Sequence, residues 1–172
     1  MFEAIIARLP RVLKLEDPVF GEIGNDENAT VQGIVVTALA AMVGNLTAEG
    51  NILGNILVGL IVAPIGLFIW TGILYVVGKM FGGQGTYSQL IRPIGYAGAP
   101  FALGIVPVIG GLAGLVYSAA IQIRAVMQIN QVKQGSAIAT VLIPMGILVV
   151  GLVILAIIAS IALFAGLGGL SD

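Results

Sequence analysis

The side chains that most often do chemistry in proteins are scarce in this sequence. The 172 residues contain no histidine and no cysteine, which excludes thiol nucleophiles, Ser-His pairs and the usual nitrogen and sulfur ligands of zinc. A paired-carboxylate mechanism needs two acids held close together. All eight acidic residues, however, lie within the first 27 residues, at Glu49 or at Asp172. We therefore expect no catalytic residue, no metal site and no cofactor.

Two further features could bind an anion or a polar substrate. Residues 82–85 form a glycine-rich stretch, and backbone amides at a helix start bind phosphate well. The stretch lacks the preceding strand and the Gly-Lys-Ser/Thr ending of a nucleotide loop, which favours an ordinary loop with positive φ angles. Arg124 lies between Gln122 and Gln128. A structural, snorkelling or lipid-facing role for Arg124 is a simpler interpretation than a substrate site.

The composition indicates which elements must position these residues. Hydrophobic residues make up 59% of the chain, charged residues make up 9%, and the mean hydropathy is +1.12. Soluble domains contain roughly 25% charged residues. Between Val31 and Leu170 the only charged residues are Glu49, Lys79, Arg92, Arg124 and Lys133. Because a membrane-spanning helix needs about 20 largely apolar residues, the sequence predicts an all-α, polytopic membrane helix bundle.

The first 30 residues are the polar part of the chain. Apolar residues recur at near-helical spacing from Phe2 to Leu13, while Glu3 and the basic residues point elsewhere, a pattern typical of an amphipathic helix. This helix could lie on a membrane surface or pack against the rest of the protein, and both interpretations stay open. Pro10 would kink or restart it. No secretory signal peptide is expected, so the first membrane helix is predicted to act as the targeting signal.

Residues 31–172 are expected to form the transmembrane domain. About five spans are predicted, at residues 31–46, 52–77, 93–106, 108–123 and 137–164. In the third segment prolines recur every seven residues, at Pro93, Pro100 and Pro107. This segment could be a full span, or a broken helix that enters the membrane and turns back.

The distribution of positive charge favours five spans over four. With a cytoplasmic N-terminus and five crossings, every basic residue lies inside, as the positive-inside rule prefers: Arg8, Arg11, Lys14, Lys79, Arg92, Arg124 and Lys133. If the third segment turned back, Arg124 and Lys133 would lie outside. We therefore predict a multi-pass protein with its N-terminus in the cytoplasm and its C-terminus outside.

Small residues mark one face of the fourth predicted span. Gly110, Gly114 and Ser118 are spaced four apart, which lets a second helix approach closely. We predict a helix-packing role for these three residues. Their replacement by leucine should disrupt assembly if this stripe faces another helix.

Residues 78–100, GKMFGGQGTYSQLIRPIGYAGAP, resemble the Yip1 (Yip-one) domain family, multi-pass membrane proteins named for interaction with Ypt and Rab GTPases. Members tend to show a double glycine after the second span, then an aromatic residue, Gln-Leu, a basic residue, Gly-Tyr-Ala and a proline. The matching residues here are Gly82, Gly83, Tyr87, Gln89, Leu90, Arg92, Gly95, Tyr96, Ala97 and Pro100. The short N-terminal region looks like that of prokaryotic members. The resemblance covers nearly the whole chain and implies five spans with a cytoplasmic start.

The resemblance implies a non-catalytic membrane protein with a role in membrane organisation, scaffolding or traffic, located in the cell membrane if prokaryotic. Membrane lipid is the expected partner, and a homo-oligomer or another membrane protein stays open. The longer cytoplasmic domain and the Asp-Leu-Tyr-Gly-Pro type motif of eukaryotic relatives are missing, so GTPase binding is doubtful. The net charge of −1 argues against nucleic acid as a partner.

The alternative function is a small transporter, channel or lipid-handling protein for an uncharged or lipid substrate. In that case the proline-broken third segment would line a cavity with Tyr96, Tyr117 and Ser118. No acidic residue lies inside a predicted span, whereas proton- or cation-coupled pathways usually contain ionisable residues at membrane depth. This absence favours the scaffold over the transporter.

Overall fold

Every regular element in the computed structural model, which describes residues 1–168, is a helix. The elements are α1 (Phe2–Leu13), α2 (Asp17–Asn25), α3 (Ala29–Gly44), α4 (Ile52–Leu57), the π-helix η1 (Val58–Val62), α5 (Ala63–Met80), α6 (Tyr87–Tyr96), the 3-10 helix η2 (Ala99–Ile105), α7 (Ile109–Asn130) and α8 (Gln134–Gly168). The predicted all-α membrane bundle is confirmed. The predicted position of the C-terminus concerns Asp172, which lies outside the described residues.

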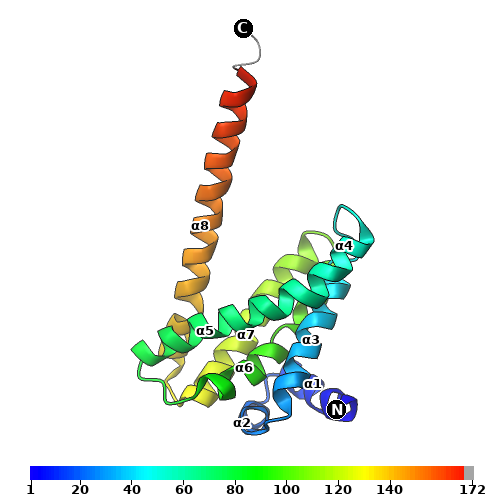
Figure 1. Cartoon of the computed structure of the whole chain (residues 1–172). Coiled ribbons are helices and arrows are strands. Elements are labelled where there is room, and N and C mark those ends of the chain that lie inside the picture. Colours follow the sequence, from blue (N-terminus) through cyan, green and yellow to red (C-terminus); the bar gives the residue numbers. More distant parts are fainter. Residues whose placement is uncertain (169–172) are drawn as a thin grey trace.

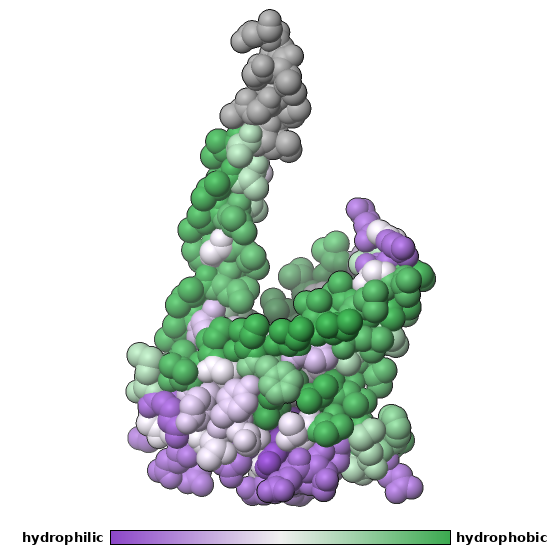
Figure 2. Space-filling model, viewed as in Figure 1, coloured by the Kyte–Doolittle hydropathy of each residue, from purple (hydrophilic) through white to green (hydrophobic). Residues whose placement is uncertain are grey.

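Polar and apolar surfaces are separated along the molecule. Hydrophilic residues gather at the end formed by α1, α2 and the neighbouring helix ends, and a second small polar patch lies at the turn before α4 (Figures 1 and 2). The surface between them is apolar, and so is the surface of α8 (Figure 2). A wide apolar band flanked by polar ends is the surface that a bilayer requires.

Three helices are long and apolar enough to cross a membrane: residues 52–80, which combine α4, η1 and α5, then α7, and the part of α8 up to Ala162. Helix α3 is apolar but has only 16 residues. The third predicted span, residues 93–106, is not one continuous helix. Helix α6 ends at Tyr96, and a 3-10 helix follows from Ala99 to Ile105. The closely spaced glycines and prolines explain the break, because proline cannot continue a helical hydrogen-bond ladder.

Pro64 lies inside the long helix without ending it. The turn just before it, Val58–Val62, is a π-helix. Proline lacks a backbone N–H, and its ring clashes with the carbonyl four residues earlier in a regular α-helix. The π-turn widens the helix at that point and so makes room for the proline ring. The same turn brings Gly59 against α3, where a Cβ atom on Gly59 would lie 2.5 Å from Met42 Cα. The predicted second span is therefore one helix with a local change of pitch.

Helix α1 packs against the rest of the chain and is not kinked into two helices at Pro10. Ile5 and Val12 are buried, while Phe2 and Ile6 on the same helix are 61% and 71% exposed. Salt bridges join α1 to the segment after it, with Arg8 2.7 Å from Asp26 and Arg11 2.7 Å from Glu22. Helix α1 therefore packs against the protein with one face and exposes apolar residues on another. The sequence had left packing and a membrane-surface position as alternatives.

Candidate functional site

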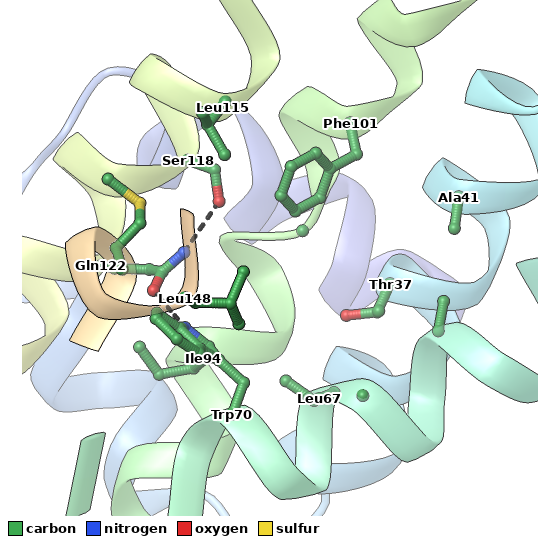
Figure 3. Close-up of a pocket in the computed structure, with 14 residues that line it drawn as sticks. Thr37, Ala41, Leu67, Trp70, Ile94, Phe101, Leu115, Ser118, Gln122 and Leu148 are labelled. Atoms are coloured by element: carbon green, nitrogen blue, oxygen red, sulfur yellow. Dashed lines mark hydrogen bonds between the residues drawn. The ribbon is translucent and has the colours of Figure 1, made fainter. Parts of the chain in front are cut away.

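A cavity of about 320 Å³ lies in the apolar band where α8 departs from the other helices (Figure 3). Six elements contribute to it: α3, α5, α6, η2, α7 and α8. Its lining residues are Thr37, Ala41, Ala63, Gly66, Leu67, Trp70, Ile94, Gly98, Phe101, Leu115, Ser118, Gln122, Met145 and Leu148. None of these described residues is charged.

Three of the four residues with polar side-chain atoms that line this cavity, Trp70, Gln122 and Ser118, form one connected chain of hydrogen bonds. Trp70 Nε1 donates to Gln122 Oε1 at 2.6 Å, and Gln122 Nε2 donates to Ser118 Oγ at 3.0 Å (Figure 3). Ser118 Oγ in turn donates to the Ala97 carbonyl at 2.7 Å. Separately, Thr37 Oγ1 donates to the Gly95 carbonyl at 2.8 Å. Each polar group therefore already has a partner within the protein.

Small residues create the space and hold its walls in place. Helices α3 and α6 cross in backbone contact, since a Cβ atom on Gly95 would lie 2.6 Å from Gly33 Cα. A Cβ atom on Gly98 would lie 2.9 Å from Thr37 Oγ1. Gly66, by contrast, has nothing within 4 Å of its Cβ position. The cavity is open where Gly66 lies because no side chain fills it.

The alternative function placed Tyr96, Tyr117 and Ser118 around a cavity, and only Ser118 lines the one observed. Tyr96 is fully buried, and its hydroxyl donates to Gln32 Oε1 at 2.6 Å. The Tyr117 hydroxyl donates to the Leu13 carbonyl. Tyr117 therefore connects the fourth predicted span to α1, whereas Tyr96 connects α6 to α3.

The glycine-rich loop packs around the end of α7. A Cβ atom on Gly83 would lie 2.8 Å from Asn130 Cγ, and Gly82 has a φ of +80°. Two of the loop amides are bonded within the protein, Gly83 N to the Gly78 carbonyl at 2.9 Å and Gln84 N to the Asn130 carbonyl at 3.1 Å. The loop thus closes the turn from α5 to α6.

The polar residues that follow this loop also make contacts between helices. Tyr87 donates its hydroxyl to the Phe68 carbonyl at 3.0 Å, which joins α6 to α5. Arg92 Nη1 donates to the Gly24 carbonyl at 2.5 Å, and its Nε donates to Thr30 Oγ1 at 3.2 Å. Arg92 therefore ties α6 to the end of α2 and the start of α3.

Arg124 and the predicted small-residue stripe also contact other parts of the same chain. Arg124 Nη1 lies 3.3 Å from Asp17 Oδ1, with both side chains partly exposed. A Cβ atom on Gly114 would lie 2.6 Å from the Pro100 carbonyl oxygen, and one on Gly110 would overlap the Leu103 carbonyl. Gly110, Gly114 and Ser118 therefore face the broken third segment.

Sequence reasoning missed Trp70, Gln122 and Thr37 as residues around a cavity. A signal was available, since Gln122 and Thr37 are polar residues within predicted spans, and such residues generally face the bundle interior. Gln32 is a second example, because it accepts from both Tyr96 and Arg8. Within residues 1–168 no group of three potential metal ligands occurs.

The Arg8–Asp26 pair predicts a pH dependence of the N-terminal region. The hydrogen bond from Arg8 holds the pKa of Asp26 below its usual range. A carboxyl group with a lowered pKa contributes stability above its unfolded pKa of about 3.9, and this stability is lost as the pH falls through the folded value. We expect faster hydrogen exchange in α1 below about pH 4, after correction for intrinsic rates.

The variant Asp26→Asn should show faster exchange in α1 already at neutral pH. Glu27→Gln is the matched control, because Glu27 is exposed and makes no salt bridge among the described residues. Equal exchange in the two variants would show that the pair does not hold α1 in place.

Comparison with known proteins adds one finding. The family model described as Yip1 domain matches residues 20–158, which covers α3 to α7 and most of α8. No curated protein and no solved structure matches this chain.

Proposed function

Because this chain belongs to the Yip1 domain family, a family of membrane proteins, we propose that it is a non-catalytic protein that organises the membrane around it. Its partner in this role is membrane lipid at the cytoplasmic surface. The proposal rests chiefly on one observation, the exposed apolar strip of α1 next to the membrane-embedded helices. Transport coupled to ions is disfavoured, since the described residues lining the cavity include no ionisable group.

We propose five crossings with the N-terminus inside. In Figure 1 the chain runs away from the polar end through α3, returns through α5, departs again through α6 and η2, returns through α7 and leaves through α8. With 10 and 7 residues, α6 and η2 would together extend at most roughly 29 Å, close to the thickness of a bilayer core. This path supports a crossing by the broken segment.

The position of α1 supports a role at the membrane surface. Its last residue, Leu13, accepts a hydrogen bond from Tyr117, and Tyr117 lies within the predicted fourth span, 13 residues before the end of α7 at Asn130. Helix α1 is therefore close to the apolar band and not suspended in solution. A helix in that position can insert its exposed apolar side chains about 5–10 Å into the headgroup boundary.

The exposed strip of α1 consists of Phe2 and Ile6, which are 61% and 71% exposed, and the preceding Met1, which is 57% exposed, extends it. Since Ile5 and Val12 on the adjacent face of α1 are buried, the strip cannot turn inward without unpacking α1. Insertion of such a strip into one leaflet expands that leaflet and favours curvature. This consequence gives the function a direct physical readout.

The experiment is reconstitution of the full chain into phosphatidylcholine–phosphatidylglycerol vesicles, with vesicle diameter measured by electron cryomicroscopy. We expect smaller vesicles or tubules as the protein-to-lipid ratio rises. The double variant Phe2→Ser/Ile6→Ser should lose the effect, and Phe2→Leu/Ile6→Leu should keep it. Unchanged vesicles with the unmodified chain would refute the proposed membrane-organising role.

The cavity favours a second candidate function, lipid handling. The two functions separate in a scrambling assay, in which the same vesicles contain a fluorescent lipid and dithionite reduces only the outer leaflet. The scaffold predicts that half of the fluorescence stays protected. Complete reduction in intact vesicles would make lipid movement between leaflets the function.

A further inference from the structure

We propose that the cavity lined by Trp70 is a binding site for a single lipid acyl chain. The site goes beyond the membrane-organising role proposed above, which depends on α1. It is distinct from the bulk contact that every membrane protein makes with lipid, because six helical elements form the walls of one defined recess.

The location of the cavity determines which molecules can reach it. Its lining residues belong to helices in the apolar band, apart from Gly98 in the turn between α6 and η2, and the surface is hollowed where α8 leaves the bundle (Figure 2). In a bilayer this region is filled with hydrocarbon. A ligand must therefore already be dissolved in the membrane, or extend into it from a headgroup at the surface.

The chemistry of the walls selects an apolar ligand. Trp70, Gln122 and Ser118 direct their polar atoms at one another and at the Ala97 carbonyl. A sugar, an ion or a phosphate in this cavity would lose its water without gaining hydrogen bonds in exchange, at a cost of several kcal/mol. A methylene chain loses nothing of this kind.

The size of the cavity fits a chain better than a helix. Its volume of about 320 Å³ lies near the lower end of the roughly 300–1,000 Å³ of small-molecule pockets. A helix with its side chains has a diameter of about 10–12 Å and needs a long, continuous groove. The size of the cavity thus favours an acyl chain. A helix of a second copy is the competing occupant, and the experiment must exclude it.

The cavity is open because small residues line part of it. Neighbouring residues that are fixed by close contacts and hydrogen bonds keep its walls apart. Ala41, Ala63 and Gly66 line it without filling it. Gly98 is held by its close approach to Thr37 of α3. The hydrogen-bonded Trp70 and Gln122 fix the floor. An unfilled apolar space forfeits the dispersion contacts of its lining, and an acyl chain would restore them.

Trp70 provides the probe, because it is the only tryptophan in the chain. The full chain is titrated in nanodiscs with a fatty acid that has a doxyl group on its acyl chain, and the quenching of Trp70 fluorescence is measured. We expect saturable quenching with one chain bound per protein. An unlabelled fatty acid should reverse it at a fixed total amount of lipid.

Two variants separate the cavity from bulk lipid. Gly66→Leu places a side chain in the open space of the cavity and should weaken binding at least about tenfold. Gly111→Leu is the matched control, because Gly111 also has nothing within 4 Å of its Cβ position and does not line the cavity. Equal thermal stability and size-exclusion profiles would show that both variants fold.

Quenching that rises linearly, or to the same extent in both variants, would overturn the proposal and indicate bulk partitioning. The variant Gly66→Cys tests the competing occupant. Disulfide or crosslinker capture of a second copy through that cysteine would assign the cavity to a helix and also overturn the proposal. Neither result would affect the vesicle-shape measurement, because that assay changes only residues of α1.

Discussion

Replacing Gly95 by alanine is expected to destabilise the folded protein strongly, although the change adds a single methyl group. The new Cβ atom would lie 2.6 Å from Gly33 Cα, 2.7 Å from Gly33 C and 2.8 Å from Gly33 O. All three are backbone atoms of α3, so no side chain can rotate away. Overpacking typically costs about 1–3 kcal/mol and occasionally more, and the rigid contact places Gly95→Ala at or above the top of this range.

The contacts around Gly95 explain why the effect should spread. The Gly95 carbonyl accepts from Thr37, and the neighbouring Tyr96 donates to Gln32. Separation of α3 from α6 would break both hydrogen bonds and move one wall of the cavity. For a chain of this size, a loss of about 3 kcal/mol lowers the melting temperature by roughly 6–12 °C. The measurement is the apparent melting temperature in detergent, at one fixed heating rate because membrane proteins often unfold irreversibly.

Gly111→Ala is the control for this prediction and has the opposite expected sign. Gly111 is exposed on α7, with nothing within 4 Å of its Cβ position. Alanine stabilises a helix relative to glycine by up to about 1 kcal/mol. If Gly95→Ala behaved like Gly111→Ala, the close crossing of α3 and α6 would be wrong.

The second large effect is expected for Gly114→Leu. A Cβ atom at this position would lie 2.6 Å from the Pro100 carbonyl oxygen and 3.5 Å from Phe101 Cα. The leucine would push η2 away from α7 and weaken the hydrogen bond from Ser118 to the Ala97 carbonyl. We expect most of the variant to elute as aggregate in size-exclusion chromatography, with loss of several kcal/mol of stability.

Gly111→Leu again provides the control, since it makes the same substitution on the open face of α7. The oligomeric state of the surviving Gly114→Leu protein adds a second readout. Because Gly114 contacts η2 of its own chain, any folded fraction should keep the oligomeric state of the unmodified protein. A folded variant with an altered oligomeric state would show instead that the stripe faces another copy.

Both predictions concern residues that the sequence marked only as small. The spacing of Gly110, Gly114 and Ser118 predicted a packing face but not its partner. Spacing along one helix is a local property, whereas the partner, η2, is a 3-10 helix whose presence depends on the glycines and prolines of another segment. The packing role of these residues stays a prediction that Gly114→Leu tests.

The resemblance to the Yip1 domain family came from residues 78–100, and the structure explains why several of these residue types are needed. Gly83 leaves room for Asn130, Gly95 permits the crossing with Gly33, and Arg92 bonds to the Gly24 carbonyl. Each reason involves a residue at least 40 positions away in the sequence. Local pattern therefore identified the family, and the purpose of each residue emerged only from the folded chain.

The sequence alone determined that this protein is a helical membrane protein, because 59% hydrophobic and 9% charged residues leave no other solvent than lipid for its surface. It also determined that the chemistry of histidine and cysteine is excluded. The tertiary structure decided which way the polar residues point. Tyr96 bonds to Gln32 of α3 and Tyr117 bonds to the Leu13 carbonyl of α1, while Trp70 and Gln122 bond to each other beside a cavity. Composition determines which solvent a surface requires, but a cavity depends on distances between helices, and these are set by contacts among residues far apart in the chain.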